Sequence, residues 1–313
     1  MGRAGSARDD SGRRERIAAQ RAAAHRTQVR NRLLLAGGAI VVVIVIVVVP
    51  IVLQGNSSSP ARNAGPAGPT GSALTQLIMQ TTTVPAATLD QVGSGSGQVT
   101  AKPTSISGNL LTSGGKPEML YIGGEFCPFC AAERWAMIVA LSRFGTFSGL
   151  ATTHSAAKNG AGNAEPFPNT PTWTFAHATY TSKFLAFTPV EETTNIPDPK
   201  TGSYTPLQTP TSAEQALISK YDAPPNVPAA DAGAIPFVDY GNKFLTVGAS
   251  YDPGVLQGLS WAQIAADLRN PASPVAKGIL GTANYMTAAI CGLTGDQPAA
   301  VCTSRIKSLQ SQI

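Results

Sequence analysis

The longest apolar stretch of the chain, residues 33–53, directly follows a strongly polar N-terminal arm. The stretch carries no charged side chain, and a helix of this length at ~1.5 Å per residue spans about 31 Å, the thickness of a bilayer's hydrocarbon core. Residues 1–32 contain nine Arg against three acidic residues. Because positive flanks stay on the cytoplasmic side, the pattern predicts one transmembrane helix, with a cytoplasmic arm and an extracytoplasmic remainder.

A cleaved signal peptide is the alternative interpretation of this N-terminus. It fits less well, because the basic region is too long, the apolar run exceeds an ordinary h-region and no small-x-small cleavage site follows. Residues 54–72 are rich in Ser, Gly, Pro and Ala, so they are expected to be a flexible linker. We therefore expect an extracytoplasmic domain over residues 73–313 of a cell-membrane protein.

Beyond the linker, hydrophobic periodicity alternates between strand and helix. The apolar run Met119–Ile122 predicts a strand, a Gly-Gly turn follows, and residues 131–144 have a helical pattern. A second strand over 149–153 is expected to complete a right-handed βαβ crossover. The other predicted elements are a helix at 74–79, paired strands at 172–180 and 183–190, a helix at 212–220, a β-hairpin at 234–247 with a Gly-Asn turn, a helix at 260–268 capped by Ser260, and a helical segment beyond Pro274.

The charge is unevenly distributed along the chain. The first 54 residues carry a net +6 and the remainder a net −1, although the whole chain is basic. The external domain is thus nearly neutral, and the charge does not indicate nucleic-acid binding. The arm is interpreted as a topology signal, with binding to anionic headgroups as the other option.

The sequence Cys127-Pro128-Phe129-Cys130, here called the CPFC motif, lies at the start of the predicted helix after Met119–Ile122. A helix start places the two sulfurs near one another and stabilises a thiolate at the first cysteine. Pro128 suits the first helical turn. We expect Cys127 to attack a substrate disulfide and Cys130 to resolve the mixed disulfide.

Two other interpretations of the motif are a zinc ligand pair and a structural disulfide. A zinc site needs a second pair nearby, whereas Cys291 and Cys302 lie far along the chain with different spacing, so no metal is expected. Four cysteines allow three pairings. We expect Cys127 and Cys130 to be the active pair and Cys291–Cys302 to be a structural disulfide, the rival role for the second pair being an electron relay.

The order of elements resembles the thioredoxin fold of thiol–disulfide oxidoreductases, over roughly residues 115–270. The resemblance rests on the CPFC motif after a strand and on Ile235-Pro236 before the predicted hairpin. It implies a cis proline at Pro236, packed against Cys127 and Cys130 as part of the catalytic site. It also implies substrate contacts by three apolar neighbours, which are Ile235, Phe126 and Phe129.

The stretch from Gly123 to Ala131, with Arg134-Trp135 after it and one N-terminal anchor, is most similar to an uncharacterised membrane-anchored thioredoxin-like family, domain of unknown function 929. The long interval between Cys130 and Pro236 departs from compact thioredoxins and implies an inserted subdomain at about 155–230. The expected fold class is α/β: a thioredoxin-like fold with an insert, preceded by one transmembrane helix.

The sequence assigns no role to several charged and imidazole side chains. Glu125, Glu133 and Arg134 either tune the thiolate or belong to a solvated helix face, which is the more usual case. His154 and His177 lack metal-like spacing and are interpreted as structural.

These observations predict a membrane-anchored oxidoreductase that exchanges disulfides with secreted or cell-envelope proteins, needs no cofactor and is recycled by a membrane redox partner. The alternative is a non-catalytic module with a locked CPFC disulfide. The two differ at the sulfur, because an enzyme needs Cys127 exposed whereas a binding module can bury both cysteines. A weaker third option is delivery of a metal or cofactor through the two thiols.

Overall fold

The computed structural model describes residues 65–313. The arm, the apolar stretch and residues 54–64 of the expected linker lie outside this range, so the predicted transmembrane helix does too. Between residues 65 and 313, no helix is both long and apolar enough to cross a bilayer. The first helix among the described residues, α2 (Gly71–Thr82), begins slightly before the expected domain start.

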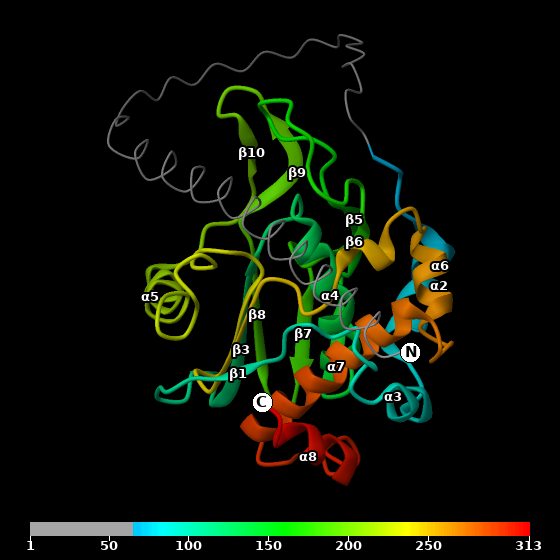
Figure 1. Cartoon of the computed structure of the whole chain (residues 1–313), viewed down its shortest axis with the longest axis vertical. Coiled ribbons are helices and arrows are strands. Elements are labelled where there is room, and N and C mark those ends of the chain that lie inside the picture. Colours follow the sequence, from blue (N-terminus) through cyan, green and yellow to red (C-terminus); the bar gives the residue numbers. More distant parts are fainter. Residues whose placement is uncertain (1–64) are drawn as a thin grey trace, which may run out of the picture.

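The described chain has a mixed α/β structure built on one six-stranded sheet (Figure 1). Its strands are β1 (Thr104–Ser105), β2 (Thr112–Ser113), β3 (Lys116–Gly123), β8 (Ala186–Glu191), β11 (Phe237–Tyr240) and β12 (Phe244–Val247). β3 is central: β8 pairs with it in parallel and β11 in antiparallel orientation. β12 and then β1 continue the sheet beyond β11, all antiparallel.

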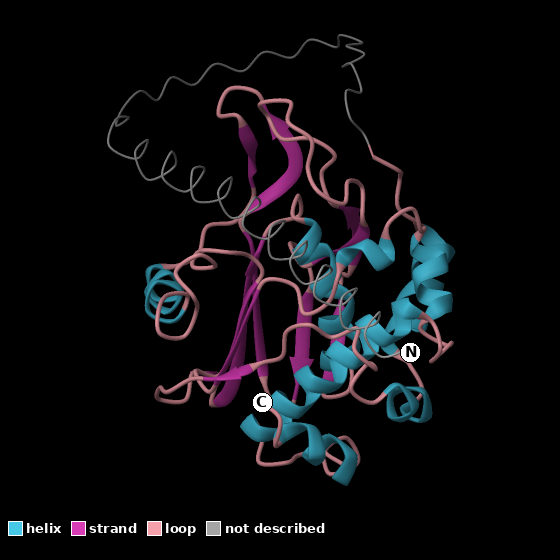
Figure 2. Cartoon of the chain, viewed as in Figure 1, coloured by secondary structure: helices cyan, strands magenta, loops and turns pink. Residues whose placement is uncertain are grey.

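Helices cover both faces of this sheet (Figure 2). Besides α2, they are α3 (Ala86–Val92), α4 (Pro128–Leu141), α5 (Ser212–Tyr221), the 3-10 helix η1 (Pro253–Leu256), α6 (Trp261–Asp267), α7 (Pro274–Leu293) and α8 (Ser304–Gln310). On one face α4 packs against α7 in the larger core, and on the other α5 closes a smaller core. The alternation of β3 explains this division, because Met119 and Tyr121 face the larger core and Leu120 and Ile122 the smaller one.

The prediction of a crossover strand at 149–153 was wrong. A strand does form there, β5 (Ala151–His154), but it pairs antiparallel with β6 (Pro171–Thr174) outside the main sheet. The parallel partner of β3 is β8. All four residues of β5 are partly exposed, whereas β8 ends in two buried residues, Val190 and Glu191.

The pairing expected between 172–180 and 183–190 was also wrong. These ranges contain three strands, β6, β7 (Thr179–Ser182) and β8, and each belongs to a different sheet, β7 pairing with β4 (Gly145–Ser148). Because β8 lies within 155–230, that range is not a single insert. The rest of it includes a hairpin, β9 (Thr193–Asp198) with β10 (Ser203–Pro206), which projects at the top of Figure 1.

Three local predictions are confirmed. The hairpin at 234–247 is β11–β12, and its turn residues Gly241 and Asn242 both have positive φ, which glycine and asparagine adopt most readily. Helix α6 begins with a capping box made by Ser260 and Gln263. Beyond Ser273 the chain is helical in α7, as the pattern after Pro274 indicated.

Candidate functional site

The CPFC motif joins the end of β3 to the start of α4. Cys127 is the N-cap residue of α4, and its Sγ accepts a hydrogen bond from the backbone N–H of Cys130 at 3.3 Å. Pro128 occupies the first turn, where a missing N–H leaves no helical bond unmade. Cys127 and Cys130 are both free thiols. The first sulfur therefore lies at the positive end of the helix, with a backbone donor directed at it.

A cis peptide bond between Ile235 and Pro236 lies beside Cys127. The Cys127 thiol donates to the Ile235 carbonyl oxygen, with 3.7 Å between sulfur and oxygen. The sheet explains this approach: β11 starts at Phe237, opposite Ile122 near the end of β3. Antiparallel pairing thus brings together two motifs that are more than a hundred residues apart.

Both sulfurs are buried. Cys127 is 1% exposed and Cys130 is 0% exposed. Part of the cover comes from the β9–β10 hairpin, because the ring of Tyr204 stacks on Phe126 with 4.2 Å between centroids. The segment 155–170 supplies another part: Phe167 meets Phe129 edge-to-face at 6.1 Å, and the N–H of Ala156 donates to the Phe126 carbonyl.

A hydrogen bond ties these two covering segments together. The Tyr204 hydroxyl donates to Oε1 of Glu165 at 2.6 Å. Burial raises the pKa of Glu165, and burial together with the Glu165 carboxylate raises the pKa of Tyr204. The charge of Cys127 contributes to the Tyr204 shift, which puts this pair within electrostatic reach of the first sulfur.

Burial also raises the pKa of Cys130 well above its ordinary value, and its interactions with Cys127 act in the same direction. The positive charge of Arg134 and a hydrogen bond from the Gly124 backbone act in the opposite direction, with smaller effect. Ionisation of Cys130 is thus disfavoured by its buried position.

A cavity of about 150 Å³ adjoins the motif. Phe129 and Ile235 form the side nearest the sulfurs, and Lys102 and Asp231 are the charged residues of its lining. The other lining residues come mainly from β12 and from the segment before Ile235: Ala101, Thr104, Asn226, Val227, Pro228, Ala234, Leu245, Thr246, Val247 and Gly248.

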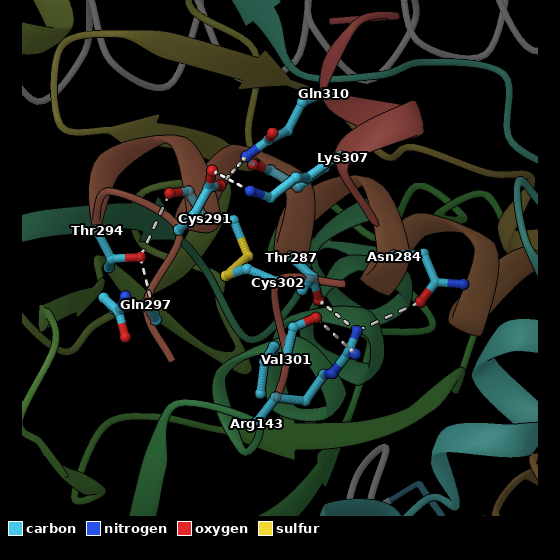
Figure 3. Close-up of a disulfide and its surroundings, with 12 residues drawn as sticks. Arg143, Asn284, Thr287, Cys291, Thr294, Gln297, Val301, Cys302, Lys307 and Gln310 are labelled. Atoms are coloured by element: carbon cyan, nitrogen blue, oxygen red, sulfur yellow. Dashed lines mark hydrogen bonds and ion pairs between the residues drawn. A yellow bond between two sulfur atoms is a disulfide. The ribbon is translucent and has the colours of Figure 1, made fainter. Parts of the chain in front are cut away.

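The structure brings together all the residues that the resemblance implied for catalysis and substrate contact: Cys127, Cys130, Pro236, Ile235, Phe126 and Phe129. Cys291 and Cys302 lie elsewhere. They form a disulfide between the last turn of α7 and the segment before α8 (Figure 3).

Sequence reasoning missed the charged residues beneath the motif. The sequence left open whether Arg134 and Glu133 tune the thiolate or lie on a solvated helix face, and the structure buries both fully. Arg134 forms an ion pair with Glu191 of β8. Glu133 accepts hydrogen bonds from the N–H and hydroxyl of Ser250, at 2.8 and 2.7 Å. The long apolar pattern of α4, which is buried over its whole length, was the signal that any charge within it must be paired.

Residues 102–292 match the family model of a domain of unknown function, DUF929. The chain belongs to this family. The matched range includes the CPFC motif, Ile235-Pro236 and the Arg134–Glu191 pair, and it ends between Cys291 and Cys302. No curated protein and no solved structure matches the chain. Family membership therefore shows an evolutionary relationship but assigns no activity.

Proposed function

We propose that this DUF929 protein is a membrane-anchored, extracytoplasmic thiol–disulfide oxidoreductase with a thioredoxin-like fold. Three features of the described residues support the fold assignment. β3, α4 and β8 form a parallel β–α–β unit, β11 and β12 extend the sheet antiparallel, and a cis Ile235–Pro236 bond immediately precedes β11. The anchor and its orientation rest on the sequence pattern of residues 1–53.

The observation that carries the proposal is the environment of the first sulfur. Cys127 Sγ lies 3.3 Å from the backbone nitrogen of Cys130 and 3.7 Å from the carbonyl oxygen of Ile235. The helix start stabilises a thiolate, and the nearby backbone of a chain segment before a strand offers a surface for an extended substrate. A free second thiol one turn away completes the requirement for exchange.

In the reaction, the Cys127 thiolate attacks one sulfur of a substrate disulfide, and the other substrate sulfur leaves as a thiolate that takes up a proton. Cys130 then loses its proton and attacks Cys127 Sγ. The Cys127–substrate bond breaks, the second substrate sulfur leaves and is protonated, and the protein holds a Cys127–Cys130 disulfide. The reverse sequence donates a disulfide to a substrate dithiol. In either direction, a membrane redox partner must return the cysteine pair to its starting redox state.

The burial of both sulfurs favours a second candidate, a non-catalytic binding module. An oxidoreductase needs a Cys127 sulfur that its substrate can reach, yet Cys127 is only 1% exposed. The oxidoreductase proposal therefore requires the β9–β10 hairpin and the segment 155–170 to move away from Phe126 and Phe129 when substrate binds. In the binding module these contacts would be permanent.

The experiment that separates the two is a redox titration of the full chain in detergent micelles. The protein is equilibrated in glutathione buffers, its free thiols are alkylated, and each cysteine is assigned by mass spectrometry, with Cys127→Ser as the control. An oxidoreductase shows a reversible transition of Cys127 and Cys130 within the range of the buffers. A pair that stays unreactive until the protein is denatured contradicts the proposal and favours the binding module.

A further inference from the structure

The buried ion pair beneath the CPFC motif is held by three strong contacts. Arg134 Nε donates to Oε1 of Glu191 at 2.8 Å and Nη2 donates to Oε2 at 2.6 Å, a bidentate arrangement that joins α4 to β8. Nη2 also donates to the carbonyl oxygen of Gly124 at 2.7 Å. Because Gly124 lies in the turn that leads to Cys127, the guanidinium is fixed against the segment that presents the cysteines.

The guanidinium also belongs to the side of α4 that carries the second sulfur. Arg134 follows Cys130 by four residues, so both side chains project from the same side of α4. The ring of Tyr121, on the neighbouring strand, lies 5.9 Å from the guanidinium carbon. Within residues 65–313, Nη1 of Arg134 has no hydrogen-bond partner although it is buried. A buried cation with an unused N–H favours a thiolate over a thiol beside it.

The charged and titratable groups around the sulfurs come from several elements. They are Cys127 at the N-cap of α4, Cys130 and Arg134 within α4, Tyr121 of β3, Glu191 of β8, Tyr204 of β10 and Glu165 of the segment 155–170. Arg134 is the cation of this set. Glu133 points elsewhere, to Ser250. The charge of Arg134 acts on Cys130, against the larger effect of burial.

We propose that Arg134, oriented by Glu191, is a positioning residue for the resolving step of thiol–disulfide exchange, where it stabilises the Cys130 thiolate. This inference rests on the proposed function. In that step Cys130 gives its proton to solvent and its sulfur bonds to Cys127 Sγ. The bond between Cys127 and the substrate sulfur breaks, and that sulfur leaves as a thiolate and is protonated. Glu191 offsets part of the charge of Arg134, so the two residues have opposite influence.

The test uses the reduced full chain in detergent micelles and one equivalent of the aromatic disulfide dithiobis(2-nitrobenzoate). Attack by Cys127 releases one coloured thiolate, and resolution by Cys130 releases a second in an intramolecular phase. The rate of this second phase as a function of pH reports the pKa of Cys130 in the mixed disulfide. Arg134→Met is expected to raise that pKa and slow the second phase at least tenfold at pH 7, and Glu191→Gln to lower the pKa and accelerate it.

Arg143→Met is the control, because it removes a partly buried arginine that lies just beyond the opposite end of α4. Arg143 bonds to Thr287 Oγ1 and more weakly to Asn284 Oδ1 and the Val301 carbonyl, close to the second cysteine pair (Figure 3). This variant should leave both phases unchanged. Arg134→Lys, which keeps the charge, should recover part of the second-phase rate.

Where the single variants do not fold, the double variant Arg134→Met/Glu191→Gln, which leaves no unpaired charge, decides the question. Its second phase should be slower than that of the native chain, because Cys130 responds to Arg134. The inference is overturned if Arg134→Met and Glu191→Gln shift the pKa in the same direction, or if the Arg134 variants match Arg143→Met. Failure of the proposed function looks different: the native chain itself releases no coloured thiolate until it is unfolded.

Discussion

Cys127 and Cys130 begin a helix beneath a cover of aromatic rings, whereas Cys291 and Cys302 connect the end of one helix to the approach of the next. All four sulfurs are buried. The first pair shares its surroundings with an ion pair, two tyrosines and a cis peptide bond. Burial alone thus does not distinguish a reactive pair from a structural one.

The surroundings of the second cysteine pair stabilise the local structure around α8. Around it, Asp296 forms an ion pair with Lys307 at 2.7 Å and accepts a hydrogen bond from Gln310 at 3.1 Å. Thr294 donates a hydrogen bond to the Gln297 carbonyl (Figure 3). The two contacts of Asp296 tie α8 to the loop that the disulfide closes. They stabilise one arrangement of the chain, whereas the charges near Cys130 act differently on its two protonation states.

The largest expected effect is that of Cys130→Ser. Without a resolving thiol, a mixed disulfide formed on Cys127 persists, so turnover stops and covalent adducts accumulate. Mass spectrometry of the full chain after exposure to a protein disulfide checks this. Cys291→Ser/Cys302→Ser should retain turnover, and a loss of turnover in that variant would support a relay between the pairs.

Removing one partner of the buried ion pair should have the next largest effect. A buried charge left without its partner costs about 3–5 kcal/mol of folding free energy, so Arg134→Met is expected to lower the unfolding midpoint strongly. Denaturant unfolding followed by circular dichroism measures this. The double variant Arg134→Met/Glu191→Gln should be more stable than Arg134→Met alone, and equal stabilities would mean that the pair is not coupled.

Removal of the second disulfide should destabilise the protein to a lesser extent. The bond joins residues separated by 11 positions, and closing a loop of that size in the unfolded chain is worth about 3 kcal/mol. Cys291→Ser/Cys302→Ser should therefore lose about this much in denaturant unfolding. The midpoint of the redox transition of Cys127 and Cys130 in glutathione buffers should be unchanged. A displaced transition would show that the two pairs are linked.

The smallest expected effect concerns the β9–β10 hairpin and the segment 155–170, which together cover the CPFC motif. Tyr204→Phe removes the hydrogen bond to Glu165 while keeping the ring on Phe126, and the loss of about 1 kcal/mol should make the cover open several times more often. Alkylation of Cys127 under native conditions should speed up by that factor. Tyr180→Phe, which loses a hydrogen bond to the Leu141 carbonyl away from the motif, is the control and should leave the alkylation rate unchanged.

Sequence reasoning succeeded where the physical cause was local. The Gly241-Asn242 turn, the Ser260 cap and the helix start at Pro128 depend on backbone preferences of neighbouring residues. It failed where a strand had to be paired with a partner far along the chain. The pattern at 183–190 indicated a strand but contained nothing that distinguished β3 from β6 as its partner, because pairing depends on which edges tertiary packing leaves available.

The sequence by itself determined that a dithiol starts a helix after a buried strand, because the spacing of cysteines, proline and apolar residues acts within a few positions of the chain. It also contained the alternation that builds the β11–β12 hairpin. Only the tertiary structure decided that Ile235 contacts Cys127, that Tyr204 covers Phe126, and that Glu191 neutralises Arg134. These contacts join residues 57 or more positions apart, and a low-dielectric interior makes their charges effective only once the sheet and its helices have closed around them.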